Sequence, residues 1–196
     1  MTKPRLFIIE TLRLSDERED LFEGGHLSKI LRLSGSRSRY MYLRTKRELE
    51  EAIDLFEDSD YRYLHISCHG GKSGIDLTFD DLSFEELGQM LKPCLDGKRV
   101  FFSSCSVMND RCAQSLLPGS GCYSVIGPSR NIAFDRATVF WSGFYHLLLR
   151  DKATSIKHDD LNETVSRLQS VFGVHMRYYR ASKTVDRGFV RVQLKV

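Results

Sequence analysis

Short apolar runs alternate with amphipathic stretches along the whole chain. The apolar runs, of the kind that forms buried strands, lie at 6–11, 40–44, 61–68, 99–104 and 122–127. Between two of them, Leu49, Ile53 and Phe56 recur at helical spacing within the stretch 46–57. Strands that alternate with helices predict a mainly parallel sheet covered on both faces. We expect the first strand to lie in the middle of this sheet.

The remaining stretches predict smaller elements. Residues 15–20 are charged and expected to be exposed, and Gly24-Gly25 marks a break before a short helix at 26–33. Ser83 and Glu86 fit a capping box that starts a helix reaching about Leu95. A short hairpin arm is expected at 75–80, helices at 110–117, 135–150 and 161–172, and basic closing strands at 175–181 and 188–196.

Composition limits the classes of protein that this chain can be. A length of 196 residues with 41% hydrophobic content favours one domain over 1–196. The net charge of +3 is far below that of a typical nucleic-acid-binding domain, and no apolar run approaches the length of a membrane span. The first residues lack the features of a signal peptide, and the five cysteines include no Cys-x-x-Cys pair. These features predict reduced thiols and a cytoplasmic location, exclude a membrane partner and disfavour nucleic acid.

Two of the predicted strands end on residues with reactive side chains. His69 follows the strand at 61–68, and Cys105 follows the strand at 99–104. Strand, helix, strand at this spacing is a βαβ unit, whose two strands are parallel and end at the same edge of the sheet. If the strands are adjacent, their ends lie about 5 Å apart. The sequence therefore predicts a nucleophile beside a base in the crevice where open α/β sheets keep their sites.

The other parts of a thiol-dependent acyl-transfer site also have candidates. Cys105 is expected where a strand meets a loop and the start of a helix, a place whose partial positive charge lowers the pKa of a thiol. Gly70 follows His69 directly, and a residue without Cβ lets its N–H approach a substrate carbonyl closely. The N–H groups of Gly70 and Cys105 are therefore the predicted oxyanion hole.

These motifs carry a resemblance to a known family. A strand that ends His69-Gly70, a helical crossover, a strand that ends Ser104-Cys105-Ser106, and a further strand running into Gly127 resemble the caspase-like cysteine peptidases. Within them the chain is most similar to the CHAT group. The resemblance implies a caspase-like three-layer α/β sandwich with His69 as catalytic histidine and Cys105 as nucleophile. It also implies a protein or peptide substrate, no cofactor, and regulation by a partner protein in trans.

The chain also departs from that family. The caspase signature Gln-Ala-Cys-x-Gly is replaced by residues 103–107, and Ser103 stands where metacaspases carry an acidic residue. Aspartate specificity and calcium dependence therefore do not follow from the resemblance. Acidic residues in loops near the expected site are candidates for binding a basic side chain of the substrate, or alternatively for turns and helix caps: Asp76, Asp80, Asp81, Asp110 and Asp135.

Structural roles compete with these functional ones. A strand cysteine is ordinarily a core residue, and this interpretation is preferred for Cys68, whose side chain must face away from that of His69, and for Cys94, Cys112 and Cys122. His65 is expected to be a hydrogen-bonded core histidine. A zinc site of His65, Cys68, His69 and Cys105 and a phosphate loop at 70–73 are both disfavoured by their spacing, and no metal is predicted.

Two alternative functions remain open. One is a catalytically inactive caspase-like module that binds a partner. The other is a flavodoxin-like binder of nucleotides or nucleic acid, for which the basic clusters within 37–47 and 177–191 would supply the binding surface. The competing interpretation of these clusters is that they are solvated faces of edge strands, whose charges deter aggregation. The preferred prediction is a cysteine endopeptidase that uses a Cys105–His69 dyad and a thioester acyl-enzyme.

Overall fold

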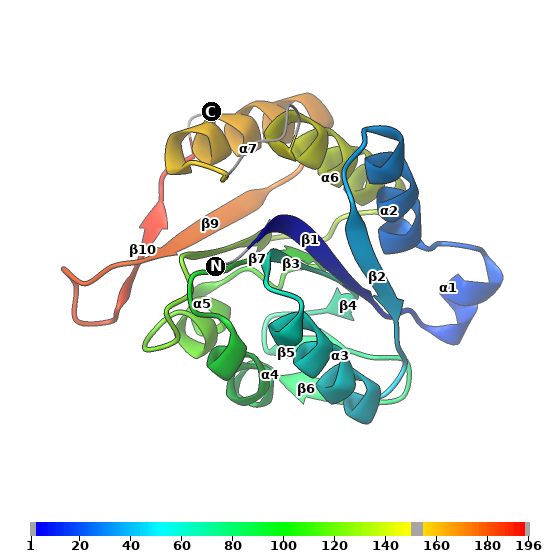
Figure 1. The fold of residues 1–196 in the computed structure, drawn as a ribbon, viewed down its shortest axis with the longest axis horizontal. Helices are drawn as coiled ribbons and strands as arrows, with labels where there is room; N and C mark the ends of the chain where they lie inside the picture. Colours follow the sequence, from blue (N-terminus) through cyan, green and yellow to red (C-terminus); the bar gives the residue numbers. More distant parts are fainter. Residues whose placement is uncertain (1–2, 150–154, 195–196) are drawn as a thin grey trace.

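A computed structural model describes residues 3–149 and 155–194 of the chain. A seven-stranded sheet in the order β10-β9-β8-β7-β3-β1-β2 runs through the molecule (Figure 1). The strands from β8 to β2 in this order pair in parallel, whereas β9 and β10 extend the sheet in antiparallel fashion. The strands are β1 (Lys3–Glu10), β2 (Ser38–Tyr42), β3 (Tyr61–Ser67), β7 (Arg99–Ser103), β8 (Ser124–Pro128), β9 (Met176–Ala181) and β10 (Phe189–Val192).

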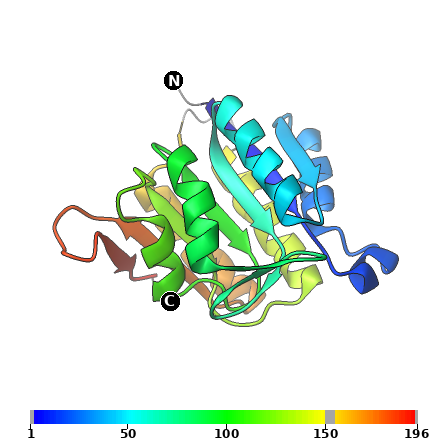
Figure 2. The ribbon, with the colours of Figure 1, turned by 90° about the horizontal axis from the view of Figure 1, so that it is seen from below.

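Helices cover both faces of this sheet (Figures 1 and 2). Successive side chains of a strand point to opposite faces, so Phe7 and Phe102 join one buried cluster whereas Ile8 and Phe101 join the other. The prediction of a three-layer α/β sandwich with a mainly parallel central sheet is confirmed. One face carries α3 (Lys46–Asp58), α4 (Phe84–Leu91) and α5 (Asp110–Leu116), and the other carries α2 (Glu23–Leu33), α6 (Phe134–Leu149) and α7 (His158–Phe172).

The first strand does not lie in the middle of the sheet. β1 pairs with β2 on one side and β3 on the other, and β2 is the edge strand. The chain adds only β2 on that side of β1, then crosses over and adds β3, β7, β8, β9 and β10 on the other side. The expectation of a central first strand was therefore wrong, although β1 is an interior strand whose residues from Leu6 onward are buried.

A second, three-stranded sheet follows β3 directly. It consists of β4 (His69–Gly70), β5 (Gly74–Asp76) and β6 (Asp81–Ser83), in antiparallel pairing. The predicted arm at 75–80 therefore covers most of the middle strand, β5, and the turn that leads to β6. His69 belongs to the first strand of this sheet, β4. The unit ends at Ser83, whose side chain caps α4 in the predicted capping box with Glu86.

Two helix boundaries differ from the prediction. The α2 helix begins at Glu23 and includes Gly24 and Gly25, because their N–H groups donate hydrogen bonds of 2.6 and 3.0 Å to the carboxylate of Glu10. The α4 helix ends at Leu91, followed by a 3₁₀ turn at Lys92–Cys94 that contains a proline. The predicted ends at 150 and 195–196 lie outside the described residues.

Candidate active site

The strands that precede His69 and Cys105 are neighbours in the sheet. β3 and β7 pair in parallel with Ser67 opposite Ser103, and the N–H of Cys68 donates to the carbonyl of Ser103 over 3.1 Å. His69 and Cys105 each follow this register pair by two residues. The expected adjacency of the two strands is confirmed, and both residues lie at the carboxyl edge of the parallel strands, where open α/β sheets bind their ligands.

His69 is held by a carboxylate that the sequence did not point to. Its Nε2 lies 2.7 Å from Oδ2 of Asp16, and the two side chains are 22% and 17% exposed. The ring of Phe134 packs edge-on against the imidazole, with 5.6 Å between ring centroids. Because an ionised carboxylate can only accept a hydrogen bond, this contact places the proton of a neutral imidazole on Nε2. Nδ1 is then the nitrogen that can accept a proton.

Asp16 lies on the short helix α1 (Leu14–Arg18), which is anchored to the edge of the sheet. The next residue, Glu17, accepts hydrogen bonds from Nε and Nη2 of Arg44 at 2.9 and 2.6 Å, and one from the hydroxyl of Tyr42. These donors, Arg44 first, lower the pKa of the Glu17 carboxyl. The expectation that 15–20 is an exposed charged run was wrong for Asp16 and Glu17, because both carboxylates have tertiary partners.

Cys105 lies in a loop between β7 and α5. Its Sγ accepts a hydrogen bond from the N–H of Ile132 (3.4 Å) and is 3.5 Å from the carbonyl oxygen of Ile132. The helix α5 begins only at Asp110, with Asn109 as its cap. The predicted loop after β7 is present, but the expected helix start at Cys105 was wrong, because the chain first turns through Ser106, which has a φ of +58°. Cys105 therefore does not lie at the positive end of a helix dipole.

Gly70 is packed tightly beside the Cys105 loop. A Cβ at this position would lie 2.6 Å from Oγ of Ser104, 2.8 Å from Cγ2 of Val107 and 2.9 Å from the carbonyl oxygen of Gly74. Antiparallel ladders alternate hydrogen-bonded and non-hydrogen-bonded pairs. Since the N–H of Gly71 donates to Gly74, the adjacent Gly70–Ile75 pair is of the second kind. The N–H of Gly70 therefore points away from β5.

The other cysteines have the core roles expected of them. Cys68, Cys94, Cys112 and Cys122 are buried, whereas Cys105 is partly exposed. Burial raises the pKa of the Cys68 thiol to about 12 and that of Cys94 to about 11. Cys105 is thus the accessible thiol of the chain.

The core also contains His65 and a buried acidic group. His65 is fully buried, and its Nδ1 lies 2.9 Å from the hydroxyl of Tyr145, as expected of a core histidine. Its Nε2 lies 3.5 Å from Oε1 of Glu23, whose other carboxylate oxygen, Oε2, accepts a hydrogen bond from the hydroxyl of Ser67. Burial raises the pKa of the nearby Glu10 carboxyl, which binds the start of α2. Sequence reasoning missed both carboxylates, which join α2 to the ends of β1 and β3.

Of the five predicted specificity residues, Asp76 is paired with His69 in the three-stranded sheet. It is the register partner of His69, and its Oδ2 is 3.2 Å from Nη2 of Arg13. Asp80 instead accepts the N–H of Lys46 at the start of α3 (2.7 Å), and Asp81 is an exposed residue at the start of β6. The first three candidates therefore lie on or beside the three-stranded sheet.

The last two candidates lie beyond β7. Asp110 accepts a 2.6 Å hydrogen bond from the hydroxyl of Tyr179 and pairs with Arg187 at 3.4 Å. Asp135 accepts the N–H of Arg136 in the first turn of α6 and lines a small cavity of about 260 Å³ beside Ile132. Asp110 is therefore an anchor for the closing strands, whereas Asp135 stands close to the loop that contacts Cys105.

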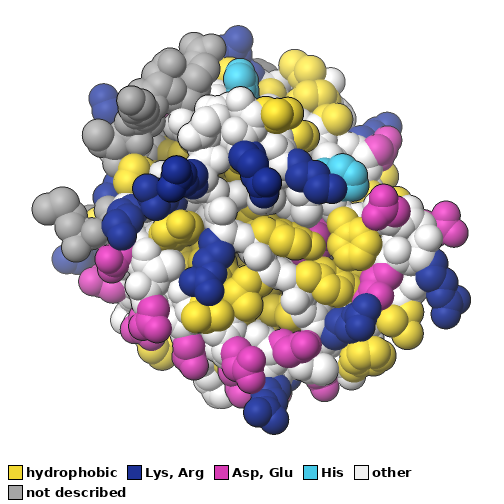
Figure 3. All heavy atoms as spheres, turned by 45° about the vertical axis from the view of Figure 1, so that its right-hand side comes forward, with side chains coloured by type: hydrophobic (Ala, Val, Ile, Leu, Met, Phe, Trp, Pro, Cys, Tyr) yellow, Lys and Arg dark blue, Asp and Glu magenta, His cyan; other side chains and the backbone are white. Residues whose placement is uncertain are grey.

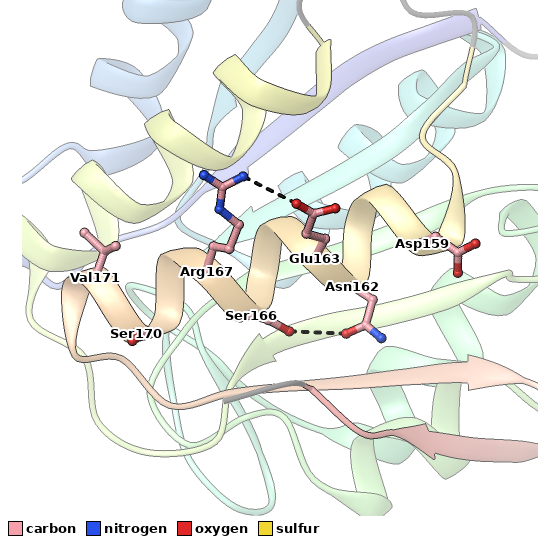
Figure 4. Close-up of a pocket in the computed structure, with 7 residues that line it drawn as sticks. All are labelled: Asp159, Asn162, Glu163, Ser166, Arg167, Ser170 and Val171. Atoms are coloured by element: carbon pink, nitrogen blue, oxygen red, sulfur yellow. Dashed lines mark hydrogen bonds and ion pairs between the residues drawn. The ribbon is translucent and has the colours of Figure 1, made fainter.

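Two other surfaces stand apart from this site. A hollow of about 690 Å³ follows the outer side of α7, where Glu163 pairs with Arg167 and Asn162 bonds Ser166 (Figure 4). Figure 3 shows a face where a band of Lys and Arg side chains borders hydrophobic ones. On β9, Arg177 and Arg180 point to opposite faces of the strand, because they are an odd number of residues apart. The second basic cluster is therefore divided between two faces.

Comparisons with known proteins identify no family for this chain. No family model matches the chain, and no curated protein matches it. Among solved structures, a two-electron reduced flavodoxin from Megasphaera elsdenii is similar to 56% of this chain and 78% of its own, with 15% identity and a TM-score of 0.35. A likeness at this level supports no inference about function.

Residues 3–149 and 155–194 contain neither a candidate metal cluster nor a helix that could span a membrane. No cluster of three or more His, Cys, Asp or Glu residues there has the arrangement of a metal site. None of the helices in these ranges combines the length and apolar character of a membrane span.

Proposed function

We propose that this protein is a caspase-like cysteine endopeptidase, with Cys105 as nucleophile and His69 as general base and acid. The observation that carries the proposal is the Asp16–His69 hydrogen bond of 2.7 Å at the end of β3, next to the strand that delivers Cys105. A carboxylate, an imidazole and a thiol in this order are the components of a thiol-dependent acyl transfer. The family resemblance of the His-Gly and Ser-Cys-Ser motifs supports the same assignment.

The proposed reaction has two steps. In the first, Nδ1 of His69 takes the thiol proton, and Sγ of Cys105 attacks the peptide carbonyl carbon. The C–N bond then breaks, His69 returns the proton to the leaving amine, and a thioester remains. In the second, water hydrolyses the thioester with His69 again as base. Asp16 keeps the imidazole in the required tautomer and orientation and stabilises the imidazolium that forms.

The backbone around Gly70 supports an oxyanion hole. The N–H of Gly70 points away from β5, and the glycine is in close contact with Ser104, the residue before Cys105. The N–H groups of Gly70 and Cys105 are the proposed donors to the developing oxyanion. The N–H of Ser106 is excluded from this role, because it donates to the carbonyl of Arg130 over 3.2 Å.

One observation favours a second candidate, a catalytically silent module that binds a partner. Both polar contacts of the Cys105 Sγ are with the backbone of Ile132, and in the described part of the chain no hydrogen bond joins this sulfur to His69. An active peptidase must therefore release Sγ from Ile132, in agreement with the proposed control by a partner protein. A silent module needs no such rearrangement.

Labelling of new N-termini by mass spectrometry tests the proposal. A cell lysate is incubated with the wild-type chain or with Cys105→Ala, and the new termini are compared. We expect cleavages that occur only with the wild type. If none appear, lysate from the native host is added to supply an activating partner. Continued absence of Cys105-dependent cleavage there overturns the peptidase and favours the silent module.

A further inference from the structure

A basic groove opens at the same edge of the sheet as Cys105. It has a volume of about 600 Å³ and lies where β8 ends, β9 begins and β10 ends. Among the described residues that line it, the titratable side chains all belong to basic residue types, namely Arg130, His175, Arg177 and Arg191, and none is Asp or Glu. We refer to this site as the β8–β10 groove.

The arginines of the β8–β10 groove have no acidic partner among the residues that the structure describes. Within 3–149 and 155–194, none of Arg130, Arg177 and Arg191 forms an ion pair. Nη1 of Arg130 instead donates to Nε2 of His175 over 3.0 Å. The carboxylate of Asp110, which interacts with β9, is bound by the Tyr179 hydroxyl and by Arg187 instead. Guanidinium groups gathered without counter-charge favour an anionic ligand.

The backbone links the groove to the candidate nucleophile. The carbonyl of Arg130 accepts the N–H of Ser106, the residue after Cys105, and the carbonyl of His175 accepts the N–H of Ser129. β8, β9 and β10 are the first, second and third strands beyond β7. At a spacing of about 4.8 Å per strand, the groove lies about 5 to 15 Å from the end of β7.

An extended peptide covers this span with a few residues. It rises about 3.3 Å per residue, so its side chains about two to four residues from the bond at Cys105 reach the groove. We infer that the β8–β10 groove binds an acidic side chain of the substrate, on one side of the cleaved bond. This inference rests on the proposed peptidase function and adds a substrate class to it. Arg177 and Arg191 are then specificity residues, and Arg130, which bonds His175, lines the same groove.

A single-stranded nucleic acid is the competing anionic ligand. Such a ligand needs a basic track along its backbone and aromatic surfaces for its bases. Here Arg180 faces away from Arg177, and the aromatic residues of β9, Tyr178 and Tyr179, are buried. The groove therefore suits one or two carboxylates of a peptide better than a run of phosphates.

A binding assay on the full chain carrying Cys105→Ala tests the inference without cleavage. The probes are fluorescein-labelled hexaglutamate, hexaglutamine and hexathymidylate DNA, followed by fluorescence anisotropy at low salt. The groove variant carries Arg177→Glu and Arg191→Glu. The matched control carries Lys29→Glu and Arg32→Glu, which reverse the same number of charges at exposed positions of α2. The single variant Arg191→Glu, at an exposed position, guards against misfolding caused by the partly buried Arg177.

We expect hexaglutamate to bind more tightly than hexaglutamine. Its affinity should fall about tenfold or more in the groove variant, because each lost charge-assisted contact contributes that order of factor, and less than about twofold in the control. Equal losses in the two double variants, or no binding of hexaglutamate, overturn the inference. Tighter binding of the DNA than of hexaglutamate, with the same loss in the groove variant, also overturns it and identifies a nucleic-acid site.

The cleavage experiment separates this inference from the peptidase itself. Cys105-dependent cleavage sites without acidic residues within about four positions of the cut contradict the acidic preference and leave the peptidase intact. The opposite result is hexaglutamate binding that depends on the groove, with no cleavage that depends on Cys105. It would support the acidic-peptide site and contradict the peptidase function.

Discussion

Charged side chains are arranged differently on the two sides of the candidate active site. On the His69 side they occur in pairs, since Asp16 binds His69, Glu17 binds Arg44 and Asp76 binds Arg13. On the Cys105 side, Arg130, Arg177 and Arg191 have no acidic partner in the described chain. Paired charges hold a catalytic group in one orientation, whereas unpaired charges remain available to a ligand. We therefore expect the paired charges to position catalytic groups and the unpaired arginines to bind a ligand.

The largest effect is expected where the two sides meet, at Gly70. In Gly70→Ala the new Cβ would approach Ser104 Oγ to 2.6 Å and the Gly74 carbonyl oxygen to 2.9 Å. We expect overpacking to lower the free energy of unfolding by about 1–3 kcal/mol. We also expect the cleavage rate to fall about 100-fold or more, because the oxyanion donor is displaced. Denaturant unfolding and cleavage assays measure the two effects.

Gly71→Ala is the matched control for this substitution. A Cβ at Gly71 would meet no atom within 4 Å. Its free energy of unfolding should therefore change by less than about 0.5 kcal/mol. Equal effects of the two substitutions would show that the loss does not come from crowding beside Ser104.

The second-largest effect is expected when the Asp16–His69 pair is changed. Asp16→Asn preserves size but removes the charge that stabilises the imidazolium and fixes its tautomer. We expect the cleavage rate to fall about 100-fold with an unchanged melting temperature and a changed pH–rate profile. Glu19→Gln, at an exposed position just after α1, should leave both the rate and the profile unchanged. A wild-type rate in Asp16→Asn would remove Asp16 from the mechanism.

The smallest effect concerns Glu17, which anchors α1 to β2. Its pKa is lowered in the folded state, first by Arg44 and then by Tyr42, from an ordinary value of 4.5. The pair therefore contributes stability fully above pH 4.5, and this contribution is lost as the pH falls through the lower folded pKa. Glu17→Gln should slightly lower the melting temperature at neutral pH and flatten its decline in acid.

A surface pair on α7 provides the comparison for Glu17. The carboxylate of Glu163 is 3.4 Å from Arg167, and both side chains are mostly exposed. Glu163→Gln should change the decline of the melting temperature in acid less than Glu17→Gln does, because solvent screens the Glu163–Arg167 pair more fully. The reverse order would mean that the Glu17 contacts do not anchor α1.

Much of the fold could be predicted because its signals are local. The apolar run at 61–68 and the capping box of Ser83 and Glu86 depend on neighbours in the chain, and both are found at the expected places. The pairing of β3 with β7 followed from the handedness and spacing of a βαβ unit. The position of β1 did not follow, because local pattern does not specify on which side of it each later strand is added.

The candidate site could be predicted only in part, for the same reason. His69 and Cys105 mark the ends of recognisable strands, whereas Asp16 lies in a short charged run that reads as exposed surface. The Gly24-Gly25 pair reads as a break, yet it lies inside α2 because a carboxylate from β1 binds its N–H groups. No local feature of the sequence announces either contact.

The sequence by itself determined the alternation of strands and helices and the arrival of a histidine and a cysteine at one edge of a parallel sheet. These features depend on side-chain periodicity and on the handedness of short connections. Only the tertiary structure decided that Asp16 binds His69, that Ile132 contacts the thiol of Cys105, and that three arginines share one groove. Such contacts join residues far apart in the chain, whose approach depends on how the packed elements are arranged.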